Sequence, residues 1–246
     1  TIAAGYDRYL TAFEVLIPSL INAFEKNVRP TDTLYQQLKE PIQIIKNWDY
    51  YAASNSVATT LAIEWAQLLN ASIRKIYIEE GEDDQVSTTK RFAATATAEQ
   101  LLTPLLTVIN NLKKNYGSWQ IEWGSINRYQ RISNDLNQKY DDRQLSYPVP
   151  FASALWGMLP SYNSRIFPGT SKRYGVSGNS FICAVEFGKK IKAKSLLAGA
   201  GIKPDWQPRP IARLSGGQKA RLAMLLLRLS NPNFYLLDEP TTHLDL

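Results

Sequence analysis

The residues best suited to chemistry lie near the carboxyl end of the chain. They form a run of small and polar side chains at the predicted start of a helix: Ser215, Gly216, Gly217 and Gln218. The first N–H groups of a helix lack partners within it, and the helix dipole makes that end positive. Such a start is suited to binding phosphate. Four apolar residues then recur at helical spacing, namely Leu222, Leu225, Leu226 and Leu229.

Two adjacent carboxylates follow this helix. A short apolar segment, 234–237, predicts a buried strand that ends at Asp238 and Glu239. Parallel α/β sheets place their ligand chemistry at the carboxyl ends of strands. The alternative is structural only: a glycine turn and a buried strand that ends in two acids.

The order and spacing of these residues give the segment a family resemblance. Residues 214–221 spell Leu-Ser-Gly-Gly-Gln-Lys-Ala-Arg, and residues 238–245 spell Asp-Glu-Pro-Thr-Thr-His-Leu-Asp. Together they resemble the signature motif, Walker B strand and D-loop of ATP-binding-cassette (ABC) ATPases. The resemblance is closest to the soluble ABC-F branch, whose usual Asp-Glu-Pro-Thr-Asn-His-Leu-Asp differs here only at Thr242.

The resemblance implies a role for each matching residue. Asp238 would bind Mg²⁺ through water, and Glu239 would be the general base that orients or deprotonates the attacking water. Residues 215–218 would clamp the γ-phosphate of an ATP molecule held by a second cassette. The D-loop would be His243, Leu244 and Asp245, with Asp245 on the nucleotide side.

Only half of an ATP site is present in these 246 residues. An ATPase of this kind needs Gly-x-x-x-x-Gly-Lys-Ser/Thr to cradle the β- and γ-phosphates, and none of the 13 glycines starts such a run. We therefore expect the chain alone to bind MgATP without useful affinity. A second ABC cassette is the partner that this half-site implies.

Composition places few limits on the rest of the chain. With 44% hydrophobic and 20% charged residues, it has the balance of one large or two small globular domains. No apolar run reaches the ~18 residues of a membrane span, so a soluble chain is expected. The lone Cys183 excludes an internal disulfide and a cysteine-based zinc site. The net charge of +6 is scattered, which indicates solvated surface rather than a nucleic-acid site.

Apolar periodicity predicts helices over most of the first half. Helical spacing recurs in 10–24, 34–45, 56–69 and 97–115, and the first three segments are expected to pack together. The acidic segment that begins at Glu79 predicts a solvated loop up to Thr97, with a cation site as the alternative. Residues 116–175 predict loops, and 180–187 with 191–197 predict a β-hairpin.

Four segments in order carry a second resemblance. They are Asn55-Ser56-Val57-Ala58-Thr59-Thr60 with Trp65, Trp123-Gly124-Ser125-Ile126-Asn127-Arg128, Phe167-Pro168-Gly169-Thr170, and Tyr174 to Phe181 continuing through Ser195 to Gly199. They look like the carboxy-terminal half of a penicillin acylase (penicillin amidase) β-chain, over residues 1–199. The alternative is a helical domain followed by an unrelated hairpin.

This second resemblance implies an N-terminal-nucleophile amide hydrolase. Its substrate would be an acyl amide, such as a β-lactam or an acyl-homoserine lactone. The family's nucleophile and oxyanion residues would all precede Thr1, in the missing α-chain and the missing first half of the β-chain, so none is assigned here. Thr1 as an N-terminal threonine nucleophile is a weaker alternative, because it leads into a helix rather than a sheet. Core packing is the expected role of Trp65 and Trp123, with support of an acyl pocket as the alternative for them and for Asn127 and Arg128.

The two resemblances together predict an α+β chain made of two pieces. A helical region and a partial sheet of N-terminal-nucleophile hydrolase type occupy 1–199, an extended linker rich in proline occupies 200–213, and an incomplete α/β ABC ATPase fragment occupies 214–246. Natural fusion, misassembled sequence and deliberate chimera all fit this junction.

The main functional hypothesis is a fragment of an amide hydrolase fused to an incomplete ABC segment, inactive alone. An ABC-F-type ATP-binding protein and a non-catalytic interaction module are the alternatives. An acylase parent implies a periplasmic or extracellular location, and an ABC-F parent implies the cytoplasm.

Overall fold

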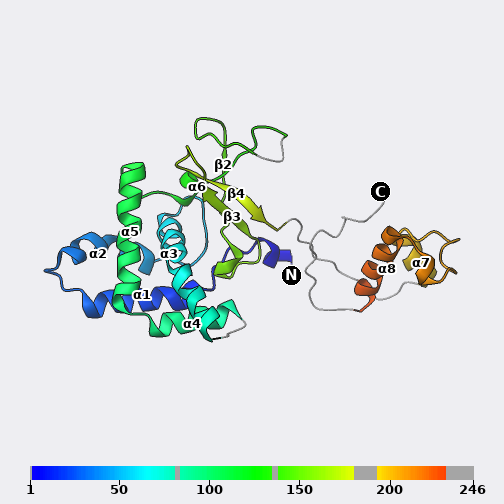
Figure 1. Cartoon of the computed structure of the whole chain (residues 1–246), viewed down its shortest axis with the longest axis horizontal. Coiled ribbons are helices and arrows are strands. Elements are labelled where there is room, and N and C mark those ends of the chain that lie inside the picture. The colour runs from blue at the N-terminus through cyan, green and yellow to red at the C-terminus, as the bar shows by residue number, and fades with distance from the viewer. Residues whose placement is uncertain (1, 81–83, 135–137, 180–192, 231–246) are drawn as a thin grey trace. The chain divides into compact units, whose positions relative to one another are not determined.

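The computed structural model describes residues 2–80, 84–134, 138–179 and 193–230. The chain divides into two compact units (Figure 1). The larger unit is Tyr6–Gly178, and the smaller one combines Thr1–Gly5 with Asn179–Leu246. Each unit is described below by itself.

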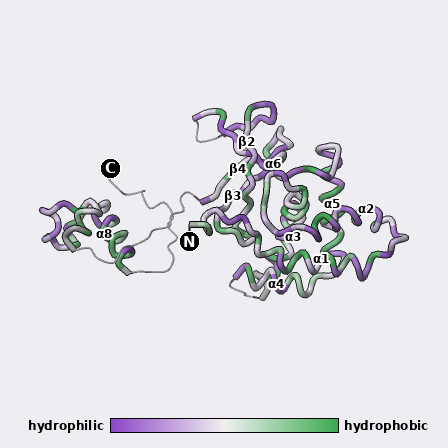
Figure 2. Tube along the Cα trace, turned by 180° about the vertical axis from the view of Figure 1, so that it is seen from behind, coloured by the Kyte–Doolittle hydropathy of each residue, from purple (hydrophilic) through white to green (hydrophobic). Residues whose placement is uncertain are grey.

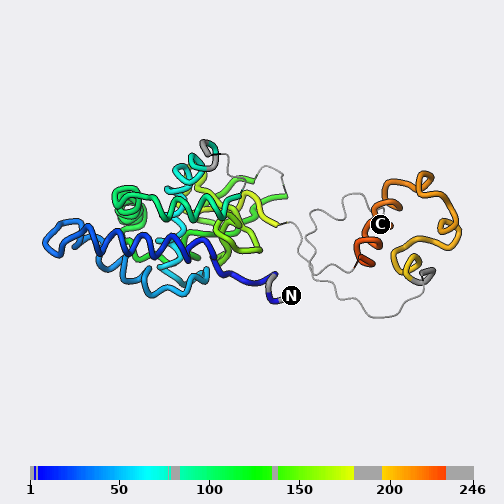
Figure 3. The backbone as a smooth tube through the Cα atoms, turned by 90° about the horizontal axis from the view of Figure 1, so that it is seen from below, coloured from blue at the N-terminus to red at the C-terminus, as the bar shows by residue number. Residues whose placement is uncertain are grey.

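Five helices form most of the larger unit. They are α1 (Phe13–Asn27), α2 (Thr33–Lys46), α3 (Val57–Glu80), α4 (Gln85–Thr95) and α5 (Ala98–Tyr116). Figures 1 and 3 show α1 and α4 running side by side while α5 crosses α1. The four helices expected from apolar periodicity are thus confirmed as α1, α2, α3 and α5.

The core of this unit lies where the apolar faces of the helices meet. Leu10, Phe13, Leu38, Trp65 and Leu105 are fully buried in it. Figure 2 shows apolar segments along α1, α3 and α5. Within one helix the buried residues recur three and four positions apart, as Phe13, Ile17 and Leu20 do in α1, so each helix turns a continuous apolar stripe inward.

The helix α4 corrects the loop expected from the acidic segment. Asp84 begins it, since its carboxylate accepts hydrogen bonds from the backbone N–H groups of Val86 (2.7 Å) and Ser87 (2.9 Å). The segment is a helix because that cap and the buried Phe92 outweigh its threonines. Of the acidic side chains in this segment, only that of Asp84 lies within the described residues, so the alternative of a cation site stays a prediction.

A small mixed sheet follows the helices, in a region where the sequence predicted loops. Its strands are β1 (Asn127–Tyr129), β2 (Tyr147–Pro148), β3 (Tyr162–Ile166) and β4 (Arg173–Gly178), and their order is β2-β1-β4-β3. β1 and β4 are parallel, while the other pairs are antiparallel. The sequence pattern did not predict these strands because they are short and polar. For example, β3 is Tyr-Asn-Ser-Arg-Ile, which lacks apolar alternation.

Three short helical turns occur among the described residues up to 178, namely η1 (Ile2–Tyr6), α6 (Trp123–Ile126) and η2 (Ala154–Trp156). Two of them, α6 and η2, lie in the larger unit, while η1 ends at its first residue. The side chain of Asn127, at the start of β1, is fully buried and donates hydrogen bonds to the carbonyls of Val149 (2.8 Å) and Phe151 (3.0 Å). Through this amide, the loop after β2 is tied to β1.

The smaller unit contains α7 (Ala193–Gly199), η3 (Ile211–Arg213) and α8 (Gly216–Leu229). The predicted hairpin is wrong over 193–197, because these residues are helical; 180–192 lie outside the described residues. Alanine, lysine and leucine favour a helix, and Gly201, with φ +73°, turns the chain just after it.

The segment predicted as an extended linker is instead a series of turns. The N–H groups of Trp206, Arg209 and Arg213 each donate to a carbonyl three residues earlier. Ile202 and Leu214, at its two ends, are buried. The prolines do not force extension here because proline is equally suited to the first positions of turns.

The fold is thus mixed α and β, as expected, but the described residues give no support to the layered sheet of an N-terminal-nucleophile hydrolase. Within the described ranges, no single helix has the length and hydropathy to cross a membrane. α4 and α5 together meet those criteria only as a pair bent by 103°.

Candidate functional site

The start of α8 is the candidate site, and a reciprocal cap builds it. Ser215 precedes the helix, and its Oγ accepts a hydrogen bond from the N–H of Gln218 at 3.2 Å. The side chain of Gln218 accepts one in return from the N–H of Ser215 at 3.0 Å. A serine cap of this kind stabilises a helix by about 1 kcal/mol. The predicted turn opening a helix is therefore confirmed.

The cap leaves other donors for a ligand. A serine hydroxyl has one donor and two acceptor lone pairs, and the cap uses only an acceptor. The O–H of Ser215 thus remains able to donate. The N–H groups of Gly216 and Gly217 occupy the first two helical positions, which have no acceptor within a helix.

The space around the start of α8 is open. Ser215 and Gly216 are exposed, and a Cβ built on Gly216 would meet no atom within 4 Å, whereas the predicted site residue Gly217 is buried. Arg213 and Lys219, on either side of the motif, are exposed as well. The positive helix end, the free donors and the two cations suit an anion with several oxygens, such as a phosphate group.

The apolar stripe predicted on α8 is only partly buried. Leu225 is 4% exposed and Leu222 is half-buried, whereas Leu226 is 56% and Leu229 is 52% exposed. The segment 234–237, predicted as a buried strand next in sequence, lies outside the described residues.

The remaining predicted site residues also lie outside the described residues. These are Asp238, Glu239, His243, Leu244 and Asp245, together with Thr1 at the other end of the chain. The roles of Asp238 in Mg²⁺ binding and of Glu239 as general base therefore stay predictions. The structure brings together only the first part of the motif, Ser215 to Gln218.

The residues singled out in the larger unit pack its core. Trp65 is fully buried and its Nε1–H donates to the carbonyl of Leu101 at 2.8 Å. Trp123 is 1% exposed, and its backbone N–H donates to the carbonyl of Ser56 at 3.1 Å. Arg128 donates to the carbonyl of Gly124 (2.8 Å) and to Ser146. The expected packing role of both tryptophans is confirmed.

A buried ion pair was not predicted from the sequence. Arg173 of β4 donates from Nη1 to Glu64 Oε1 of α3 at 2.9 Å, and from Nη2 to Gln67 Oε1 at 2.7 Å. Burial raises the pKa of Glu64, while the adjacent Arg173 acts to lower it. The one signal in the sequence is a carboxylate within the apolar stripe of the third predicted helix; its partner lies 109 residues away.

A capped helix start with an exposed serine and an exposed glycine, here Ser215 and Gly216, is a type of site that binds phosphate in many nucleotide-binding proteins. The sequence profile of the ABC transporter family matches residues 68–242, more than half of the chain. The chain therefore belongs to the ABC transporter family.

Individual relatives match shorter stretches. ATP-binding cassette sub-family F member 3 of Homo sapiens is 54% identical over 46 residues, which are 19% of this chain and 6% of that protein. ABC transporter F family member 4 of Arabidopsis thaliana is 43% identical over 60 residues, 24% of this chain and 8% of that protein. The probable ATP-binding protein YheS of Escherichia coli (strain K12) is 47% identical over 55 residues, 22% of this chain and 9% of that protein.

The chain thus spans less than a tenth of the length of these curated relatives. All of these matches are to ABC proteins, and none supports the resemblance to penicillin acylases. The interpretation kept as the alternative, an ABC-F-type ATP-binding protein, fits these matches better than the acylase fusion.

Proposed function

We propose that this chain contributes the signature-motif half of an ATP site in an ABC-F-type ATPase. The observation that carries the proposal is the exposed start of α8, where Ser215 and Gln218 cap each other and donors remain for a phosphate. A second cassette, with its own Gly-x-x-x-x-Gly-Lys-Ser/Thr loop, supplies the cradle for the same nucleotide.

In this proposal each residue of the motif has a separate task. The Ser215 hydroxyl and the N–H group of the exposed Gly216 donate to γ-phosphate oxygens, and Gln218 orients Ser215 through the cap. Asp238 would hold Mg²⁺ through water, and Glu239 would accept the proton of the attacking water. Mg²⁺, when bound, would neutralise part of the phosphate charge. Asp245 of the D-loop would contact the nucleotide.

The test uses Gly216→Asp. A side chain at Gly216 meets no other atom, and an acidic residue in the first turn favours a helix, so α8 is expected to stay folded. The new carboxylate would lie where the γ-phosphate binds and would repel it. We expect MgATP-dependent association with a purified cassette of the Escherichia coli relative to weaken by at least about tenfold. Sedimentation with and without MgATP measures this association. Both the Gly216→Asp chain and the chain it is compared with also carry Glu239→Gln, so that hydrolysis does not disperse the complex.

The matched control is Gly216→Ala, which adds a methyl group without charge at the same open position. It should retain most of the MgATP-dependent association. If Gly216→Asp associates as well as Gly216→Ala, the helix start does not contact the phosphate and the proposal fails.

A second candidate function rests on the larger unit and is an amide hydrolase of the penicillin acylase type. Two of the segments that carry the resemblance meet: Trp123 donates its N–H to the carbonyl of Ser56, within the 55–60 segment, and Gly124 donates to the carbonyl of Ser54, just before it. A Cβ on Gly124 would lie 2.6 Å from Ser54 Cβ, so this approach depends on glycine.

This second candidate predicts no amine release from a chromogenic acyl amide by the chain alone, because the nucleophile belongs to the missing part. Refolding with an acylase α-chain and the first half of a β-chain should restore turnover. Turnover by the chain alone that disappears in Thr1→Ala would instead favour the N-terminal threonine, and no turnover after refolding would refute the candidate.

A further inference from the structure

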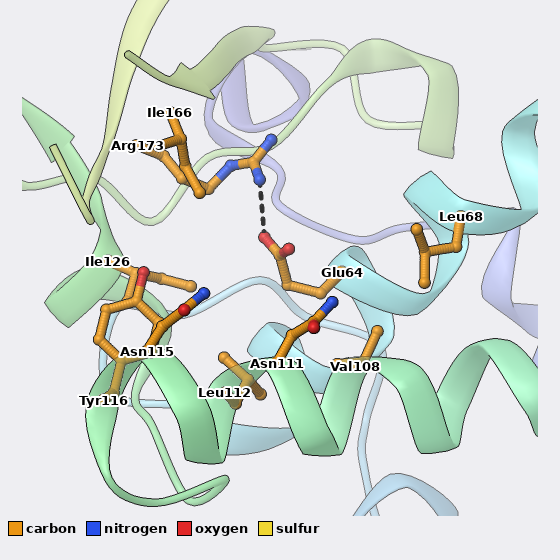
Figure 4. A pocket seen from close by; sticks show the side chains of 10 residues that line it. All are labelled: Glu64, Leu68, Val108, Asn111, Leu112, Asn115, Tyr116, Ile126, Ile166 and Arg173. Atoms are coloured by element: carbon orange, nitrogen blue, oxygen red, sulfur yellow. Dashed lines mark hydrogen bonds and ion pairs between the residues drawn. The ribbon is translucent and has the colours of Figure 1, made fainter. Parts of the chain in front are cut away.

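One pocket of the larger unit has the composition of a ligand site outside the ABC motif. It has a volume of about 110 Å³ and lies among α3, α5, α6 and the sheet (Figure 4). A cavity of ~150 Å³ can take the six carbons of benzene, so this one encloses about four non-hydrogen atoms, and the rest of a slightly larger ligand would extend into its mouth. Its mouth is open, because Leu68 is 45% and Ile166 is 46% exposed.

The inner wall of the pocket carries one negative and one positive side chain, so its net charge is zero. Glu64 and Arg173 are the charged residues among those lining it, and they form the 2.9 Å ion pair described above. Their side chains keep only 23% and 10% of their exposure. Since the pair cancels its own charge, an ionic ligand would lose hydration without a net opposite charge to replace it.

Uncharged polar groups border the same space. Asn111 and Asn115, four residues apart on α5, direct their amides toward the pocket, and Glu64 faces it from α3 (Figure 4). Both asparagines are exposed, and each amide offers donors and an acceptor. Tyr116 already donates its hydroxyl to the carbonyl of Ser171, so that oxygen can serve as an acceptor.

The apolar part of the lining is suited to a short branched chain. Val108, Leu112 and Ile126 are almost completely buried below the mouth, and Leu68 and Ile166 flank it. The pocket thus combines an apolar wall with amide groups that both donate and accept. A primary carboxamide has the matching pattern, with an NH₂ group for Glu64 or an asparagine oxygen and a carbonyl for an asparagine NH₂.

We propose that the pocket bordered by Glu64, Asn111, Asn115 and Arg173 binds a small neutral primary carboxamide with a short branched aliphatic chain. The site lies in a different unit from α8 and does not depend on the proposed ATP function. The asparagines orient the amide group, and the buried aliphatic residues contact the chain.

The probe is isobutyramide, titrated into the full chain and followed by ¹H–¹⁵N correlation spectra. We expect saturable shifts of the Asn111 and Asn115 side-chain NH₂ signals, with a dissociation constant on the order of millimolar for six non-hydrogen atoms. Isobutyrate and protonated isobutylamine have nearly the same shape with opposite charges. Each should bind at least about tenfold more weakly, because the pocket has no net charge.

Asn111→Leu tests the amide contact with little change of volume, and we expect it to weaken isobutyramide binding about tenfold. Asn110→Leu is the matched control, because Asn110 is also exposed on α5 but does not line the pocket; it should leave binding unchanged. The spectra of both variants report whether the unit is folded. Tighter binding of either charged probe, equal effects of the two variants, or no saturable shift with isobutyramide would each overturn the proposal.

Discussion

Trp65→Ala should lower the free energy of unfolding of the larger unit by about 3–5 kcal/mol. The indole is fully buried in the core, and its Nε1–H donates to the carbonyl of Leu101 at 2.8 Å, which links α3 to α5. Alanine leaves a cavity that helices already fixed by other contacts cannot fill, and it removes the hydrogen bond. The change approaches the whole stability of many small domains.

Equilibrium urea unfolding followed by far-ultraviolet circular dichroism measures this loss without relying on tryptophan fluorescence. Trp65→Phe retains an aromatic ring but no donor, so it should cost clearly less than alanine. Ile78→Ala, on the same helix but with 71% of Ile78 exposed, should change stability by at most about 0.5 kcal/mol. Equal losses for Trp65→Ala and Ile78→Ala would mean that α3 does not pack through Trp65.

Arg173→Met should destabilise the larger unit by about 3 kcal/mol, because it leaves the Glu64 carboxylate buried without its partner. The figure is at the low end for buried pairs, since the Glu64 side chain keeps 23% exposure and reaches some water. Adding Glu64→Gln to this variant removes the unpaired charge and should recover part of the loss. A double variant no more stable than Arg173→Met would show that the lost hydrogen bonds, rather than the charge, dominate.

The same pair gives a pH dependence with a definite sign. Burial raises the pKa of Glu64, and Arg173 opposes this rise. In Arg173→Met the folded-state pKa should therefore lie further above the unfolded value. At a pH below the ordinary pKa of a carboxyl, Glu64 is protonated in both the folded and the unfolded state, so no charge is buried. As the pH rises, Glu64 ionises first in the unfolded state, and the free energy of unfolding falls.

Arg173→Met should therefore have a lower free energy of unfolding than the double variant with Glu64→Gln, and this difference should be larger at about pH 8 than at about pH 4. Because both proteins share every other carboxylate, their difference isolates Glu64. A difference that does not change with pH would mean that Glu64 is ionised, or protonated, in both states throughout.

The helices were predictable from sequence because each has a long apolar stripe of helical period, as in Leu101, Leu105, Ile109 and Leu112 of α5. The helix α4 was missed since its stripe is short and its start is acidic; the useful signal was Asp84 as a cap rather than a loop residue. The sheet was missed because its strands depend on pairing between distant segments, not on a local pattern.

The candidate site was predictable from sequence only where its residues lie close together in the chain. Ser215 and Gln218 cap one helix from three residues apart, so spacing alone indicated their geometry. The pocket of the larger unit combines Glu64, Asn111 and Arg173 from three elements. No spacing rule brings such residues together, because the turns between them determine where each one lies.

The position of β4 in the chain sets the order in which the larger unit can be completed. β4 pairs with both β1 and β3, and Arg173 at its start contacts Glu64, 109 residues earlier. Contacts at such separation form after local ones, because closing a long loop costs more entropy. During synthesis α1 to α5 can therefore associate before the strand that unites the sheet exists. Until residue 173 emerges, Glu64 on α3 lacks its counter-ion, and β4 then supplies both that partner and the strand that joins β1 to β3.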